Sequence, residues 1–154
     1  VRFTENILEE NKSARIEIKS FDITECNLFE KKELDLKKKE KVTRINSIGY
    51  INNSPSVITF RSIPHERFPK FINHFVKKQS VTKAFKLLNV KKIIRSKTLI
   101  SAEISDKIKS NLLNIDVGKP LIKTTSINVD FNKTPIELSE SYFDGSKIQI
   151  LVKV

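Results

Sequence analysis

Two alternating stretches joined by a short turn constrain the fold of this 154-residue chain most strongly. Residues 41–52 (KVTRINSIGYIN) and 56–63 (SVITFRSI) are rich in the β-branched and aromatic residues that strands favour. The junction between them, residues 52–55 (NNSP), contains residue types that tight turns prefer. These stretches therefore predict a long antiparallel hairpin.

A second hairpin is expected near the C-terminus, and it carries many hydroxyl groups. Residues 124–126 (TTS) lie on its first strand, and Ser139 and Ser141 lie on its second. Glu137 stands between two apolar residues on the same strand, where an ionised carboxylate needs polar partners. This pattern favours a polar cavity that binds a small molecule over a dry core.

Apolar side chains at three- and four-residue spacing predict helices between the strands. The phenylalanine-rich stripe of residues 68–88 is interpreted as core packing. The predicted helices are residues 2–11, 27–32 and 65–75, a helix capped by Ser80, and a helix capped by Ser105 with Ile108, Leu112 and Ile115 facing inward.

Further strands are predicted at residues 14–24, with a bulge at Lys19 and Ser20, and at residues 93–103. Gly145 is expected to turn the chain into a last strand, residues 147–154. Strands joined by tight turns imply an antiparallel sheet, so the predicted fold class is α+β, with helices packed on the sheet.

Composition supports one domain with one core, because 38% of the residues are hydrophobic and ten are Phe. The sequence has no apolar run of membrane-spanning length and no secretory signal pattern, so a cytoplasmic location is expected. The single cysteine, Cys26, rules out an internal disulfide framework, and one cysteine with two isolated histidines does not favour a structural zinc site. No metal or other cofactor is expected.

The formal net charge of +11 is the usual electrostatic sign of nucleic-acid binding. However, the 29 Lys and Arg residues are interspersed with 18 acids, and lysine outnumbers the arginine that reads phosphates and base edges. The densest run, residues 37–41 (KKKEK), is interpreted as a solvated loop. Direct DNA binding by this surface is an alternative that predicts strong salt dependence.

Five motifs follow one another along nearly the whole chain: RFTENI (2–7), PSVITFRSIP (55–64), SVTKAFKLLNV (80–90), ISAEISDKIKSNLLNIDVGKPLI (100–122) and TPIELSESYFDG (134–145). In this order they resemble the UTRA domain, the effector-binding domain of GntR-type transcriptional regulators of the HutC subfamily. The first motif is most similar to the members that regulate phosphonate uptake and breakdown.

The resemblance implies a chorismate-lyase-like fold for residues 1–154 as a single domain. It also implies a winged-helix DNA-binding domain of about 70 residues before Val1, if domains keep their typical size. The expected function is to sense a small metabolite and to dimerise, and an anion such as a phosphonate or sugar phosphate is one candidate for the metabolite. DNA would be contacted only through the preceding domain, and no membrane is involved.

The family's site residues match only in part. Its Arg-x-Arg pair falls on Ser47 and Gly49, so both cations are absent. Arg61 lies two residues after Thr59, so both side chains are expected to share a face of the strand and to point into the same pocket. Arg44 lies three residues before Ser47, so its side chain is expected to point to the other face, away from the pocket. The predicted ligand-binding residues are Arg61, Ser80, Thr82, Thr125, Glu137 and Ser139. Ser47 and Thr59 are secondary candidates.

A single arginine does not replace the pair of arginines that would hold an anion, so a neutral or amine-bearing effector is an alternative to an anionic one. The shared fold also leaves an enzymatic alternative, a chorismate-lyase-like activity in which Arg61 holds a carboxylate and Glu137 assists elimination. The sequence has no Gly-rich phosphate loop, nucleophile elbow or paired metal ligands at recognisable spacing. A ligand-sensing role, and not an enzymatic one, is therefore the prediction.

Overall fold

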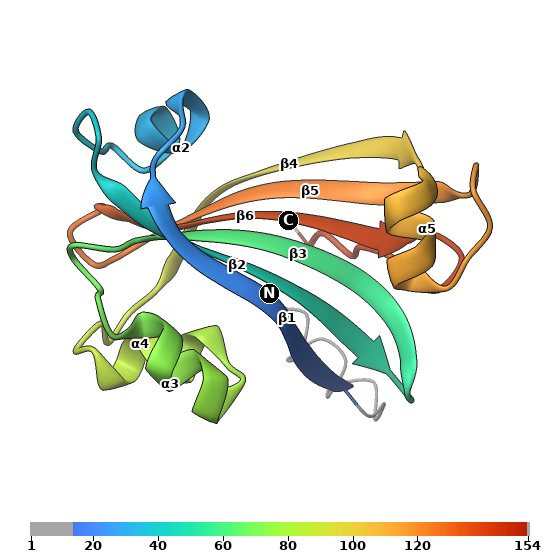
Figure 1. Ribbon diagram of the computed structural model, residues 1–154, viewed down its shortest axis with the longest axis horizontal. Coiled ribbons are helices and arrows are strands. Elements are labelled where there is room, and N and C mark those ends of the chain that lie inside the picture. The colour runs from blue at the N-terminus through green and yellow to red at the C-terminus, as the bar shows by residue number, and fades with distance from the viewer. Residues whose placement is uncertain (1–13, 154) are drawn as a thin grey trace.

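The computed structural model describes residues 14–153, which form one six-stranded sheet and four helices (Figure 1). The strands are β1 (Ala14–Glu25), β2 (Lys41–Ile51), β3 (Ser54–Pro64), β4 (Ile94–Ile104), β5 (Pro120–Val129) and β6 (Pro135–Asp144). The helices are α2 (Leu28–Glu33), α3 (Phe71–Lys78), α4 (Val81–Leu87) and α5 (Lys107–Leu113). The helix expected at residues 2–11 lies outside the described residues.

The strands follow one another across the sheet in the order β1-β2-β3-β6-β5-β4, and every neighbouring pair is antiparallel. Both predicted hairpins, β2–β3 and β5–β6, are confirmed. They join through β3 and β6, whose register places Arg61 opposite Ser139. The α+β class with an antiparallel sheet is therefore confirmed.

Two further expectations about strands have different outcomes. The bulge in β1 is confirmed, because the β1–β2 register shifts between Ile18 and Ser20. The prediction of a last strand at residues 147–154 is wrong, since none of residues 147–153 belongs to a strand. Both edges of β6 are already paired, with β3 and β5, so the chain leaving β6 finds no free edge beside it. Gly145 still allows the turn, because the backbone there approaches Pro120 closely. A Cβ at position 145 would lie only 3.1 Å from the Pro120 carbonyl oxygen, which is tighter than most Cβ contacts.

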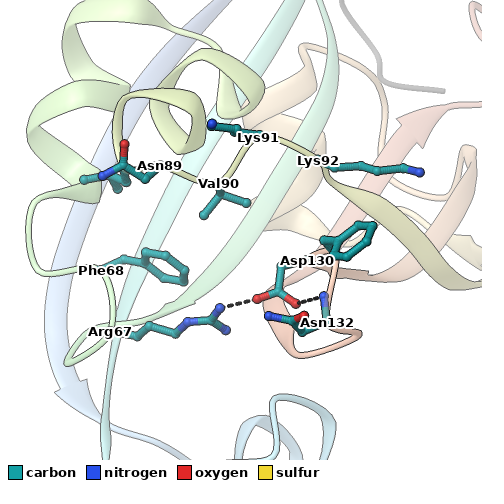
Figure 2. A pocket seen from close by; sticks show the side chains of 10 residues that line it. Arg67, Phe68, Asn89, Val90, Lys91, Lys92, Asp130 and Asn132 are labelled. Carbon is teal, nitrogen blue, oxygen red and sulfur yellow. Dashed lines mark hydrogen bonds and ion pairs between the residues drawn. The ribbon is translucent and has the colours of Figure 1, made fainter.

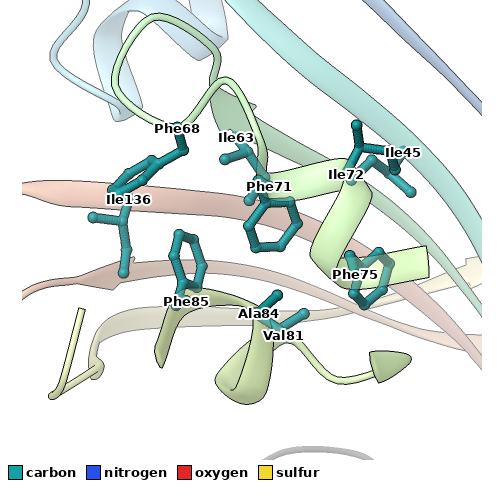
Figure 3. Close-up of a cluster of buried hydrophobic side chains, with 10 residues drawn as sticks. All are labelled: Ile45, Ile63, Phe68, Phe71, Ile72, Phe75, Val81, Ala84, Phe85 and Ile136. Carbon is teal, nitrogen blue, oxygen red and sulfur yellow. The ribbon is translucent and has the colours of Figure 1, made fainter. Parts of the chain in front are cut away.

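Helices α3 and α4 cover one face of the sheet with a phenylalanine-rich core (Figure 3). The ring of Phe85 lies 4.7 Å from that of Phe71 and 5.2 Å from that of Phe68, measured between centroids. Ile45 and Ile63 pack against these rings from the sheet. The phenylalanine stripe is therefore core packing, as predicted.

The opposite face packs against α2 and α5 (Figure 1). Helix α2 begins at a capping box in which Asn27 and Glu30 each accept a hydrogen bond from the other's backbone N–H. Glu30 is buried and accepts hydrogen bonds from Arg44 and Ser62 of the sheet. Arg44 thus faces away from the α3–α4 side, as its parity indicated.

Two helix starts differ from the prediction. Helix α3 begins at Phe71 and not at residue 65, because Pro69 disfavours helical geometry in the preceding residue. Helix α5 is capped by Asp106, whose carboxylate accepts from the Lys109 N–H at 2.8 Å. Ser105 instead donates to the Asp116 carbonyl and accepts from the Lys119 N–H, both at 3.0 Å.

The inward face of α5 also differs from the prediction. Ile108 is 70% exposed and Leu113 is fully buried, because the helix rests on the side that carries Ser110 and Leu113. Leu112 and Ile115 are partly buried against the core, as expected.

Candidate functional site

Polar side chains occupy the sheet face that α3 and α4 cover, beyond the edge of the phenylalanine core. Alternation along each strand and the register between strands bring them onto one face. The register pairs on this face are Ser47 with Thr59, Thr59 with Ser141, Arg61 with Ser139, Ser139 with Ser126, and Asn128 with Glu137.

Arg61 and Glu137 form a buried ion pair at the centre of this face. The Nε of Arg61 donates to Oε2 of Glu137 at 2.5 Å, and the two side chains are only 12% and 4% exposed. The guanidinium lies 5.3 Å from the ring centroid of Phe75 in α3. Within the described residues its Nη1 is buried without a hydrogen-bond acceptor. The carboxylate is therefore neutralised, whereas the guanidinium keeps an unused donor.

Arg95 extends this pair towards the edge of the sheet. Asn128 donates to Oε1 of Glu137 at 2.5 Å and accepts at 2.6 Å from the Nε of Arg95. The Nη1 of Arg95 donates to the hydroxyls of Ser126, at 2.9 Å, and Thr98, at 3.2 Å. We call Arg61, Arg95, Ser126, Asn128 and Glu137 the arginine–glutamate cluster.

Electrostatics couple the two arginines to the carboxylate. Burial of the Arg95 guanidinium lowers its pKa, the negative charge of Glu137 raises it, and the positive charge of Arg61 lowers it again. These effects require the three groups to lie near one another. Two guanidinium charges against one carboxylate leave the cluster with one net positive charge.

Five of the predicted ligand-binding residues share this face: Arg61, Glu137, Ser139, Ser47 and Thr59. Thr125 does not share this face. It alternates along β5 with Leu121 and Ile127, which pack in the cores on the α2 and α5 side of the sheet. Ser80 caps α4 by accepting from the Lys83 N–H at 3.3 Å, as predicted, and Thr82 lies in the first turn of that helix.

Arg95 and Asn128 were not predicted as site residues. Asn128 has the parity of Ser126, so strand alternation alone identifies it. Arg95 and Thr98 are three residues apart and would face opposite sides of a regular strand. The β4–β5 register shifts between Arg95 and Lys97, and this bulge turns both side chains to the same face. No pattern in the sequence marks that bulge.

A separate open hollow of about 640 Å³ lies beside the β5–β6 turn (Figure 2). An ion pair between Arg67 and Asp130 forms part of its wall, and Phe68 and Val90 form another part. Asp130 also accepts backbone N–H groups of the turn, including that of Asn132. Its carboxylate is thus occupied in holding the turn.

Within residues 14–153, no group of three or more His, Cys, Asp or Glu side chains is placed to hold a metal ion. None of the helices described there is long and apolar enough to cross a bilayer.

Comparison with known proteins identifies the family. The sequence profile described as the UTRA domain matches residues 9–149. The chain belongs to the UTRA domain family.

The sequence of this UTRA domain is similar to those of transcriptional regulators. It is 28% identical over 90 residues to an uncharacterised HTH-type transcriptional regulator of Rhizobium meliloti, covering 58% of this chain and 37% of that protein. It is 22% identical over 120 residues to the probable fructoselysine utilization operon transcriptional repressor of Escherichia coli K12, covering 78% of this chain and 49% of the repressor. The matched part thus spans half or less of the length of these relatives, which are named as transcriptional regulators.

Solved structures share the fold of this UTRA domain. The effector domain of PhnF from Mycobacterium smegmatis superposes with a TM-score of 0.89 at 14% identity, over 99% of this chain and 94% of that one. A GntR-family regulator from Enterococcus faecalis V583 superposes with a TM-score of 0.80 at 19% identity, over 90% and 99%. At these identities the likeness concerns the fold.

Proposed function

We propose that this UTRA domain senses a small metabolite for a bacterial GntR-type regulator of the HutC subfamily. The observation that carries the proposal is the arginine–glutamate cluster, a charged group on the sheet face beside the α3–α4 cover. Its Arg61–Glu137 ion pair is buried, whereas Arg95 is exposed on the edge strand β4. Burying an ion pair in a stable core brings no general gain, since apolar residues of similar volume stabilise as well or better. A charged cluster at this position is better suited to recognition.

The hydroxyl groups around the cluster support a polar ligand. Ser139 lies in register between Arg61 and Ser126, and Thr59 and Ser141 exchange a hydrogen bond of 3.0 Å. Hydroxyls both donate and accept, so they can hold a ligand whose polar groups are of either kind. We assign Arg61, Glu137, Ser139, Ser47 and Thr59 to the proposed site and add Arg95, Ser126 and Asn128.

The helical cover supplies a means of transmitting the signal. Helices α3 and α4 pack on each other through the rings of Phe71 and Phe85 and approach the cluster through Phe75. A ligand held between sheet and helices changes the regulator only if it binds two arrangements with different affinity. Contacts of Ser80 and Thr82 at the start of α4 with the ligand, which the family resemblance implies, would provide such a difference. Thr125 is left out because it faces the other side.

We further propose that the full-length protein carries a winged-helix domain before residue 1 and acts in the cytoplasm as a DNA-binding regulator. The relatives support this proposal, since the matched part covers half or less of their length and their names describe HTH-type or operon regulators. Residues 1–154 would then form the single effector-binding domain, and DNA would be contacted through the preceding domain.

The edge strand β4 supports the proposal of a homodimer. It is eleven residues long, and its outer edge pairs with no described strand. Leu99, Ile100 and Ile104 are 62%, 53% and 73% exposed. Long edge strands with exposed apolar residues readily pair with a second chain. Sedimentation of the wild type and of a Leu99→Lys, Ile100→Lys variant tests this contact, and an unchanged dimer would contradict it.

The test of the proposed site is a ligand screen with two variants and a control. The 154-residue chain is screened by thermal shift against phosphonates, sugar phosphates, sugar amines and amino-acid derivatives, and hits are measured by titration calorimetry. Arg61→Ala and Glu137→Ala are expected to weaken binding of a hit at least tenfold. Arg44→Ala removes an arginine from the opposite face and is expected to leave binding within about twofold. Unchanged binding in both site variants would show that the site lies elsewhere.

A further inference from the structure

The open hollow beside the β5–β6 turn is separate from the proposed ligand site (Figure 2). Its wall comes from the loop before α3, the segment that follows α4, and the turn at residues 130–132. The arginine–glutamate cluster contributes none of the residues that line it. An occupant of this hollow would therefore leave the sheet face free.

Much of the wall is apolar. Phe68, Leu88 and Val90 line the hollow and form the outer edge of the phenylalanine-rich core. Phe131 in the β5–β6 turn adds an aromatic ring to the lining, and this residue is 74% exposed. Aromatic side chains bury a large area when a second surface covers them, and they are enriched at protein interfaces.

The β5–β6 turn holds the backbone around Phe131 in place. Oδ1 of Asp130 accepts the N–H groups of Asn132, at 2.9 Å, and Thr134, at 3.0 Å, and Oδ2 pairs with Arg67. A group that is already fixed loses little conformational freedom on binding. Phe131 is therefore presented to a partner at a small entropic cost.

The unpaired charges around the hollow are positive. Arg67 and Asp130 neutralise each other. Lys91 and Lys92, which lie above this pair in Figure 2, are exposed and have no acidic partner among residues 14–153. The described lining contains no unpaired acid. Charge complementarity thus favours an occupant with acidic groups.

The open form of the hollow favours a protein segment over a small molecule, because small-molecule sites usually enclose most of the surface of their ligand. The backbone at Lys91 and Lys92 supports the same interpretation. Its N–H groups have no acceptor in the part of the chain that the structure describes, and the β4 ladder begins only at Ile94. An extended peptide can bind such free backbone groups.

We propose that this hollow binds an acidic segment of a partner protein through one aromatic or aliphatic side chain. That side chain packs between Phe131 and the apolar wall at Leu88 and Val90, and acidic residues beside it pair with Lys91 and Lys92. The buried apolar anchor supplies most of the affinity, while the ion pairs at the rim set orientation and the rate of association. This interaction does not depend on the effector or on the proposed ligand site.

The test titrates the 154-residue protein with three synthetic peptides and follows backbone NMR signals. The first peptide has a central phenylalanine between glutamates, the second has serine in place of the phenylalanine, and the third has lysines in place of the glutamates. The first is expected to cause saturable shifts at residues 88–92 and 130–132. The other two are expected to bind at least about tenfold more weakly, because each lacks one of the two features that the hollow recognises.

Two variants with matched controls locate the binding. Phe131→Ser is expected to lower the affinity for the first peptide about tenfold, whereas Phe21→Ser on β1, where the ring is 51% exposed, is expected to leave it unchanged. The double variant Lys91→Gln, Lys92→Gln is expected to lower the affinity about threefold and to reduce its salt dependence.

The control for that double variant is Lys77→Gln, Lys78→Gln, which removes two adjacent exposed lysines at the end of α3, outside the lining of the hollow. Its affinity is expected to match the wild type. Equal losses in the two lysine variants would show a general effect of net charge and contradict the proposed contact.

Three further results would overturn the inference. The first is an absence of saturable shifts with the acidic peptide, and the second is equal affinity of wild type and Phe131→Ser. The third is a DNA duplex of arbitrary sequence that shifts the same signals more strongly than the peptide, because the surface would then be a nucleic-acid contact. Arg61→Ala is expected to keep the peptide affinity, and a loss there would place the peptide on the sheet face and contradict the inference.

Discussion

The Nε of Arg61 on β3 and the Oε2 of Glu137 on β6 lie 2.5 Å apart in the middle of the sheet. The two strands belong to different hairpins, so this ion pair connects the N-terminal and C-terminal halves of the sheet. Asn128 and Arg95 continue the connection across β5 to the edge strand β4. The same bonds that define the proposed ligand site thus also join the two hairpins.

Glu137→Gln is expected to destabilise the protein by about 3–5 kcal/mol, because it leaves the buried Arg61 charge without its counter-ion. The double variant Arg61→Met, Glu137→Leu removes both charges and is expected to recover most of that loss. Urea unfolding followed by circular dichroism measures both free energies. A double variant as unstable as Glu137→Gln would contradict the interpretation.

The exposed pair of Lys19 and Glu17, with a separation of 2.8 Å, provides the comparison. Lys19→Gln is expected to leave the urea midpoint unchanged, since solvent screens exposed ion pairs.

Phe85→Ala is expected to cost about 3–5 kcal/mol, because Phe85 is fully buried and contacts the rings of Phe68 and Phe71. Leu87→Ala on the same helix is the control. Leu87 is 51% exposed, so its loss is expected to stay within about 1 kcal/mol. Thermal and urea unfolding measure both variants, and similar losses for the two would contradict the described packing of α4.

Ser105 and Ser110 are both buried and give a matched pair of substitutions. The Ser105 hydroxyl bridges the Asp116 carbonyl and the Lys119 N–H, so Ser105→Ala is expected to cost about 1–3 kcal/mol. The Ser110 hydroxyl has no hydrogen-bond partner in the part of the chain that the structure describes. Ser110→Ala is therefore expected to be neutral or slightly stabilising in the same urea assay, and a large loss there would contradict it.

The stability contributed by Glu30 is expected to depend on pH. Burial raises the pKa of its carboxyl, but hydrogen bonds from Arg44, the Asn27 N–H and Ser62 outweigh burial and hold the pKa below 4.5. Because the folded pKa lies below the unfolded one, this stabilisation is present above pH about 4.5 and is lost as the pH falls through the folded pKa.

The measurement compares wild type and Glu30→Gln in urea across a pH series. The difference in their free energies of unfolding is expected to be constant near neutral pH and to shrink below pH about 4.5. A difference that stays the same down to pH about 3 would show that Glu30 contributes through its shape and not through its charge.

Much of the fold followed from local chemistry. Turn residues at 52–55 and the alternation on either side predict the first hairpin, and Ser80 predicts the start of α4. The alternation of side chains along the strand likewise predicts that Thr59 and Arg61 share one face of the sheet, which is the face towards α3. These features depend on a residue and its near neighbours, so the sequence carries them directly.

Errors occurred where distant parts of the chain decide the structure. The predicted strand at 147–154 is absent over the described residues because β6 already has a partner on each side. Ser105 does not cap α5 because its hydroxyl is used by the chain that returns at Asp116 and Lys119. In both cases an ordinary local preference yields to contacts across the fold.

The sequence by itself determined two hairpins, a hydroxyl-rich face and a carboxylate that needs partners. Only the tertiary structure decided which side chains are the partners of that carboxylate, Glu137. The pairing of β3 with β6 brings Arg61 to Glu137, and the bulge in β4 turns Arg95 towards Asn128. Alternation specifies which face a side chain takes within one strand, but strand order and register specify its neighbours, and these are set by packing of the whole sheet.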